Sequence, residues 1–394
     1  MSTPTDTRST LGSSTGSHPE GPPGRTSRLS GRPQFYRTYG QQLALFNTRP
    51  KLIGVAAIVL GSLALVYVLT DSMLQTLAIA FAYAIGALGL NIVTGLAGQV
   101  SLGHAFFLGV GAYTAAAISG DPDGRTIGFG ITNILVWLPA AGLVAGIAGV
   151  AIAPLATRLR GLYLAIVTLG LVFIGEHIFR QWSDLTGGSG VGREGAIPEL
   201  FGLELLTSGE VLTGDQKVYL LMLVLLCLFA LGACNLARSR IGRSFAAVRD
   251  RDMAAEMMAI NLPRTKTLAF GISSFYAGCS GALIYSIIGF FEPSSFSLLL
   301  SVEFIAMVLI GGAGTVSGTI MGALFISLLP TLTRELPAYV PFISANVTVT
   351  PNVFQLESIL YGLLIVVFLL FEPRGLFGIW VRIRNYWKGW PFSY

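Results

Sequence analysis

Charged side chains are scarce in this chain, and their scarcity sets its class. Only 11% of the 394 residues are Asp, Glu, Lys or Arg, while 53% are hydrophobic, and the mean hydropathy is +0.69. Soluble domains carry roughly 25% charged residues, so a soluble globular fold is excluded. The apolar segments do not show the alternation of barrel strands. We therefore expect an all-α polytopic membrane protein.

Cysteine, histidine and nucleotide-binding motifs are equally sparse. The chain has three cysteines and three histidines; Cys227, Cys234 and Cys279 lie in apolar segments without metal-ligand spacing, and the histidines do not cluster. No GxxxxGK[ST], GxSxG or HExxH motif is present, so no ATPase or other catalytic centre is predicted. We expect this chain to bind no metal, cofactor or nucleic acid.

Apolar windows long enough to approach a bilayer crossing begin after residue 50. A crossing helix needs roughly 20 residues, and about ten such helices are predicted, several of them short or broken. Residues 1–50 are rich in Ser, Thr, Gly and Pro and are expected to form a disordered cytoplasmic tail, with no removable signal peptide. The ten windows are 52–70, 73–94, 102–118, 131–155, 162–182, 218–236, 268–290, 296–312, 318–332 and 356–371.

Lysine and arginine set the expected orientation, because short basic loops stay in the cytoplasm. Basic residues gather before the first window, at Arg158 and Arg160, in the loop 237–266 and after residue 373. Ten crossings place all four groups, and both termini, on the cytoplasmic side. A single crossing over 296–332 would place the basic C-terminal segment on the other side of the membrane, whereas a re-entrant loop would keep all four basic groups on the cytoplasmic side. A transmembrane domain is thus predicted over 51–377, with an extracytoplasmic loop at 183–217 and a basic cytoplasmic segment at 378–394.

Two short glycine-rich motifs resemble each other. GLAGQVS at 95–101 and GGAGTVS at 311–317 agree at five of seven positions, and each separates an inward-running window from one that returns. An internal duplication is therefore predicted, with a path near the interface of the repeats. Glycine lets helices approach closely and lets the chain turn. The glycines expected at the two helix junctions are Gly95, Gly98, Gly311 and Gly314.

Polar groups inside apolar windows are candidates to line a path, because they are costly in hydrocarbon. Two alternatives stay open: His104 is also interpretable as a packing histidine, and Glu176 has the i,i+4 spacing of a structural ion pair with Arg180. The path candidates are Asn91, Gln99, Ser101, His104, Glu176 and Glu303.

The loop 237–266 is the most informative polar region. Ser244 to Met258 has helix-forming composition, and its apolar methionines would suit a docking partner. The alternative is a solvated loop whose charges only fix topology.

This loop, together with NIVTGLAGQVSLGHAFFLGVGAYTAA and MVLIGGAGTVSGTIMGALF, resembles the LivM-type permease subunit of branched-chain amino acid ABC importers over roughly 52–377. The resemblance implies a second related permease, two cytoplasmic ATPases that hydrolyse ATP, and an extracytoplasmic substrate-binding protein, all at a bacterial cytoplasmic membrane. It also implies that the loop carries the helix that docks on an ATPase. The coupling residues expected there are Arg249, Asp252, Ala254, Ala255 and Glu256.

The family resemblance implies branched-chain amino acids as substrates, with urea or short amides as the alternative. Two other classes of function stay open. An ion-coupled secondary transporter would use Glu176 or Glu303, and a channel or scaffold subunit would show no energy dependence.

Overall fold

The computed structural model describes residues 49–334 and 353–389, except residues 123, 160, 201, 208, 210, 211 and 373. The chain divides into two compact units, residues 1–58 and 59–394. Because the described residues begin at 49, only the last two positions of the tail predicted over 1–50 are among them. The last five residues of the predicted segment 378–394 lie outside them as well.

The described residues are mostly helical, and a helix lies at each of the ten predicted apolar windows. Five helical segments are long and apolar enough to cross a membrane: Asp71–Leu96, Ile134–Leu155, Leu162–Gln181, Gly214–Arg238 and Leu262–Ile288. The helices at the ten windows are α2 (Arg49–Val68), α3 (Asp71–Asn91) with the π-helix η1 (Ile92–Leu96), α4 (His104–Ser119), α5 (Ile134–Arg158), α6 (Leu162–Gln181), α8 (Gly214–Arg238), α11 (Leu262–Ile288), α12 (Leu298–Gly311), α13 (Val316–Arg334) and α15 (Val353–Phe371).

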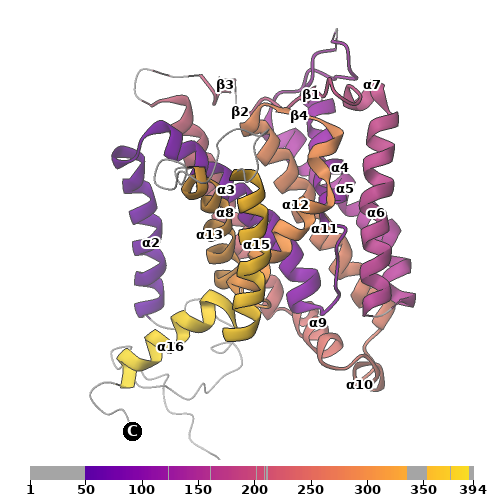
Figure 1. Ribbon diagram of the computed structural model, residues 1–394, viewed down its shortest axis with the longest axis vertical. Coiled ribbons are helices and arrows are strands. Elements are labelled where there is room, and N and C mark those ends of the chain that lie inside the picture. Colours follow the sequence, from indigo (N-terminus) through magenta and orange to yellow (C-terminus); the bar gives the residue numbers. More distant parts are fainter. Residues whose placement is uncertain are drawn as a thin grey trace, which may run out of the picture. The chain divides into compact units, whose positions relative to one another are not determined.

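Shorter elements lie at the two ends of the helices (Figure 1). At one end, called here the strand end, β1 (Arg193–Glu194) pairs antiparallel with β4 (Phe290–Phe291), and β2 (Glu199–Leu200) pairs antiparallel with β3 (Leu203–Glu204). The other end, called the loop end, carries three short helices. These further elements are α7 (Ser183–Thr186) and η2 (Pro293–Phe296) near the strand end, and α9 (Arg240–Asp250), α10 (Asp252–Met257) and α16 (Gly375–Gly389) at the loop end.

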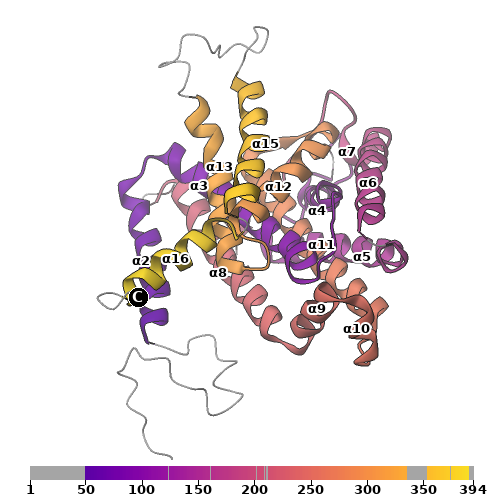
Figure 2. The ribbon, with the colours of Figure 1, turned by 60° about the horizontal axis from the view of Figure 1, so that its bottom comes forward.

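Helix α11 lies at the centre of the core of the second unit, between α3, α4 and α5 (Figure 2). Its side chains are buried along almost its whole length. Small residues make this possible: a Cβ on Gly111 of α4 would overlap the backbone of Gly278, and a Cβ on Gly281 would overlap the backbone of Leu108. Close backbone approach of this kind lets apolar helices pack tightly against one another.

Local signals define where the central helices begin. Thr213 and Gln216 form a reciprocal capping box at the start of α8. At α11, Asn261 Oδ1 accepts from the Arg264 amide at 3.0 Å, and Pro263 follows within the first turn. Side-chain caps satisfy amides that have no partner inside the helix.

Candidate functional site

The GLAGQVS motif forms the first helix junction, residues 91–103. It follows Asn91, the last residue of α3, and the π-helical turn η1 interrupts the regular helix there. Gly98 has φ of +68°, a conformation open to glycine without steric cost. The Gln99 amide then donates to Val93 O at 2.9 Å. The motif thus closes η1 and leads the chain into α4.

The GGAGTVS motif forms the second junction, residues 311–318. α12 ends at Gly311 and α13 begins at Val316. Gly314 holds the same place in this motif that Gly98 holds in the first, and its φ of +83° lies in the same left-handed region. The agreement between the two motifs is therefore also an agreement in backbone conformation.

The two junctions touch each other through the side chain of Asn91. Its Oδ1 accepts from the Gly314 amide at 2.7 Å, and its Nδ2 donates to Thr315 O at 3.4 Å. Asn91 is buried. A Cβ on Gly95 would overlap both Asn91 Oδ1 and the Gly314 nitrogen. Glycine at 95 is therefore required for the contact, which joins segments 223 residues apart in the sequence.

Arg249 extends from α9 onto both junctions. Its guanidinium donates to Gly95 O at 3.0 Å, a carbonyl of the π-helical turn. Its stem packs on Gly98, where a Cβ would lie 2.6 Å from Arg249 Cγ, and a Cβ on Gly314 would lie 3.2 Å from an Arg249 amino nitrogen. The side chain remains 43% exposed. Through these contacts, one cation joins the loop 237–266 to both motifs.

The loop 237–266, called here the docking loop, is not the single helix that composition predicts over Ser244 to Met258. It forms α9 and α10, separated at Arg251, whose φ of −158° is extended. Ser239 Oγ accepts from the Gly242 amide at 3.2 Å and starts α9 before Ser244. The composition favoured helix throughout, whereas the break lets α10 fold back toward α11.

An ion pair fixes α10 to the first turns of α11. Lys266 Nζ lies 2.9 Å from Asp252 Oδ2, and the lysine side chain is only 2% exposed. A buried ammonium is stable only when it is paired. Asp252, a predicted coupling residue, therefore has a partner within the chain.

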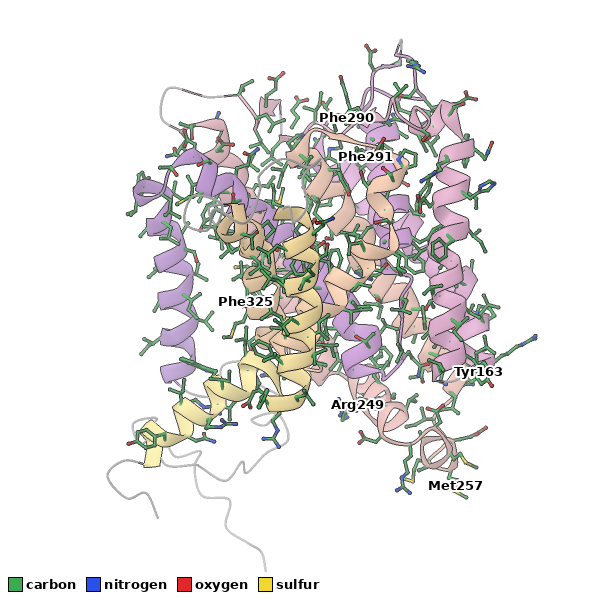
Figure 3. The ribbon with its side chains drawn as sticks, viewed as in Figure 1. Tyr163, Arg249, Met257, Phe290, Phe291 and Phe325 are labelled. Carbon is green, nitrogen blue, oxygen red and sulfur yellow. The ribbon has the colours of Figure 1, made fainter. Side chains whose placement is uncertain are left out.

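The other predicted coupling residues of α10 differ in exposure. Ala255 is buried against Val248 and Leu262, whereas Ala254 and Glu256 are exposed. Large apolar side chains surround them on the surface: Met253 is 73%, Met257 90% and Met258 78% exposed. Figure 3 shows Met257 at the outer limit of the loop end, with Arg249 closer to the helices. The exposed surface formed by Met253, Ala254, Glu256, Met257 and Met258 is called here the methionine surface.

A cleft of about 400 Å³ lies beside the contact of Arg249 with the first junction. Gly98 and Gln99 line it from the junction, and Arg249, Asp252 and Lys266 line it from the loop and α11. Both positive and negative side chains face it. Gln99, a path candidate, therefore opens onto the loop end of the molecule.

The path candidates around α4 are buried among hydrogen-bond partners of the chain itself. His104 Nε2 lies 3.0 Å from Gly86 O, and its ring contacts Phe304. Gln99 Nε2 donates to Ala97 O at 3.3 Å, and Ser101 is buried beside it in the sequence. The first junction and the start of α4 thus carry Gln99, Ser101 and His104 as buried polar residues, and Asn91 precedes the junction at the end of α3.

The two glutamates lie on different helices. Glu176 and Arg180 form an ion pair on α6, as the i,i+4 spacing predicts. Glu303 is half-buried on α12, next to Phe304, whose ring meets His104.

Arg193 at the strand end was missed in the sequence, where it reads as one polar residue of a glycine-rich loop. It is buried, and its guanidinium donates to Ala116 O at 2.6 Å, Leu185 O at 2.6 Å and Ile127 O at 2.5 Å. Burial lowers the pKa of this guanidinium. Ala116 belongs to the last turn of α4, whose carbonyls favour a cation. Arg193 therefore ties the loop to α4.

A cluster of aromatic rings also lies at the strand end. The spacing of these residues in the sequence did not predict it. The rings of Tyr113 and Tyr285 each lie 4.9 Å from that of Phe291, and Tyr113 also contacts Phe179 and Phe296. Figure 3 places Phe291 opposite to Arg249 along the helices. Within the described ranges no three His, Cys, Asp or Glu side chains come together as a metal site.

Known proteins resemble most of the chain. The family model described as branched-chain amino acid transport system / permease component matches residues 72–369. The high-affinity branched-chain amino acid transport system permease protein LivM of Escherichia coli (strain K12) is 30% identical over 84% of this chain and 75% of that protein. LivM of Salmonella typhimurium (strain LT2) is 31% identical over 75% of this chain and 67% of that protein.

A second type of permease also matches, at lower identity. The permease protein LivH of Escherichia coli (strain K12) is 26% identical over 64% of this chain and 81% of that protein. No solved structure gives a significant match. With helices at all ten apolar windows and a family match over most of its length, the chain belongs to the permease components of branched-chain amino acid transport systems, which are membrane subunits of ABC importers and not enzymes.

Proposed function

We propose that this chain forms part of the path of an ATP-driven importer for branched-chain amino acids, with urea or short amides as the alternative substrates. The names of the LivM and LivH relatives support this substrate class. Two separate cytoplasmic ATPases hydrolyse the ATP, a second related permease completes the path, and an extracytoplasmic binding protein delivers the solute. This chain itself needs no cofactor.

The observation that carries the proposal is the contact that Arg249 of the docking loop makes with both junctions. The methionine surface offers a partner exposed apolar area on α10. Lys266 and Asp252 fix α10 to α11, and Arg249 fixes α9 to Gly95. A partner that displaces α10 would therefore also move α11 and the junctions, as a change between two states requires.

The proposed topology has ten crossings with both termini in the cytoplasm. Five long helical segments and five shorter apolar helices are available among the described residues. The short helices α12 and α13 meet at the second junction, and whether they cross or re-enter leaves the orientation unchanged. The docking loop then faces the cytoplasm, and the loop 183–217 faces the binding protein at a bacterial inner membrane.

An internal duplication accounts for the two junctions. Each repeat contributes a helix, a glycine motif with a left-handed residue and a following helix: α3 and α4 in one, α12 and α13 in the other. Gly98 and Gly314 hold equivalent positions in the two motifs and share positive φ. We place the path beside their contact, with Asn91, Gln99, Ser101, His104 and Glu303 as the polar groups near it.

Docking is tested by placing charge on the methionine surface. Met257→Glu and Glu256→Arg change only exposed side chains, so the chain should fold and yet bring down less ATPase and transport less. Ala255 is a poorer target, because it is buried and a larger residue would disturb the docking loop itself. The matched control is Leu206→Glu, because Leu206 is an exposed apolar side chain at the strand end.

The measurements are copurification of the ATPase subunits from detergent and uptake into vesicles containing the complete complex. Loss of both with Met257→Glu, together with unchanged copurification in Leu206→Glu, supports docking on this surface. Unchanged copurification and uptake with both docking-loop variants would contradict it.

A further inference from the structure

Helix α16 leaves the end of α15 at the loop end of the molecule. In both Figure 1 and Figure 2 its axis turns away from that of α15. Gly375, with φ of +62°, makes this turn. α15 has 19 residues and is apolar from Ile359 to Phe371, whereas Glu372 and Arg374 follow directly. α16 therefore begins where a hydrocarbon-spanning helix gives way to charge.

One side of α16 is apolar and partly exposed. With 3.6 residues per turn, Ile379, Trp380, Ile383 and Tyr386 fall within about 120° of the helix circumference. Their side chains are 36%, 53%, 48% and 63% exposed, respectively. Four large apolar side chains on one exposed stripe are costly in water.

Cations border this apolar stripe on both sides. At the same helical spacing, Arg382 lies beyond one edge and Arg384 beyond the other. Arg382 binds Glu372 at 2.8 Å while remaining 74% exposed, and Arg384 is exposed. A helix with an apolar face that carries Trp, bordered by arginine, has the composition of helices that lie in the membrane interface.

The first turn of α16 is packed on the second junction. A Cβ on Gly312 would lie 3.3 Å from Phe377 Cβ, and one on Gly318 would lie 2.9 Å from the same atom. A Cβ on Gly375 would lie 2.6 Å from the Gly312 nitrogen. The base of the helix is therefore fixed to GGAGTVS, while its later turns extend away.

We propose that α16 lies flat on the membrane surface at the loop end, with its apolar stripe at the acyl boundary and its arginines on anionic headgroups. The position after α15, the exposed stripe and the bordering cations all fit a lipid surface. Through Phe377 and Gly375, lipid contact holds the second junction at a fixed depth. The proposal does not depend on the substrate or on the energy source of transport.

Spin labels at two exposed positions of the full chain test the immersion of the stripe. Cys227, Cys234 and Cys279 are replaced, and Ile383→Cys or Asn385→Cys is labelled in vesicles containing phosphatidylglycerol. Ile383 lies in the stripe, and Asn385 lies on the opposite side of the helix. We expect a ratio of oxygen to aqueous nickel accessibility several-fold higher at 383 than at 385.

A second measurement avoids the cysteine substitutions. Brominated lipids should quench more tryptophan fluorescence in the native chain than in Trp380→Phe, and the difference is the contribution of Trp380. Equal accessibility at 383 and 385, or no quenching of Trp380, would overturn the proposal. Shielding of Ile383 from both reagents would also overturn it, because a protein would then cover the stripe.

The lipid charge is tested separately. Vesicles of phosphatidylcholine alone, or the variant Arg384→Gln, should lower the accessibility ratio at 383. A ratio unaffected by either change would overturn the assignment of anionic headgroups as the partners of the arginines.

Discussion

Replacing Asn91 by leucine should loosen the contact between the two junctions while keeping a side chain of similar shape between them. Asn91 Oδ1 accepts from the Gly314 amide at 2.7 Å, and the side chain is 1% exposed. Removing a buried acceptor leaves the amide unsatisfied, at a cost of about 1–3 kcal/mol. Local opening at Gly314 should therefore become about 5- to 150-fold more frequent.

Hydrogen exchange on peptides that cover residues 311–318 measures this opening directly. The control is Gln99→Ala, because Gln99 bonds within its own motif, to Ala97 O, and should leave exchange at 311–318 unchanged. The reasoning fails if Asn91→Leu exchanges at 311–318 as slowly as the native chain, or if Gln99→Ala accelerates exchange there equally.

Three further substitutions test other contacts. Asp252→Asn should destabilise the docking loop more than Lys266→Met, by about 2 kcal/mol, because it leaves the less exposed partner charged and unpaired; exchange of 252–266 would show the order. Arg193→Lys cannot reach three carbonyls at once, so proteolysis within 183–204 should accelerate on the order of tenfold or more. Gly281→Ala should lower the thermal stability of the solubilised chain by about 1–3 kcal/mol, because its Cβ overlaps the Leu108 backbone; an unchanged midpoint would contradict that packing.

The helices could be predicted from the sequence because each one is marked by its own apolar window. Apolar windows of about 20 residues form helices in hydrocarbon whatever their neighbours are, and each predicted window is helical. The Glu176–Arg180 pair follows from spacing within one helix. The similarity of the two glycine motifs also had a physical basis, since Gly98 and Gly314 both need a left-handed conformation.

The contacts between distant segments had no comparable signal. Nothing in the residues around Asn91 indicates Gly314 as its partner, and nothing in the basic loop distinguishes Arg249, which donates to Gly95 O, from its neighbour Arg251. In the sequence Asp252 is one of several loop charges, and it pairs with Lys266 only because α10 folds back toward α11. These partners are fixed by tertiary packing, which helical periodicity does not encode.

Transport by an Arg249→Ala complex, set beside its ATP hydrolysis, tests most directly whether the docking loop drives the junctions. The methionine surface is untouched, so the ATPases should remain bound and hydrolyse ATP. Loss of a half-exposed, charged hydrogen bond to Gly95 O is worth about 1–1.5 kcal/mol, so uptake per ATP should fall on the order of tenfold. Arg251→Ala, which removes an exposed cation two residues away, should leave it unchanged. Native uptake per ATP in Arg249→Ala would contradict the coupling proposed here.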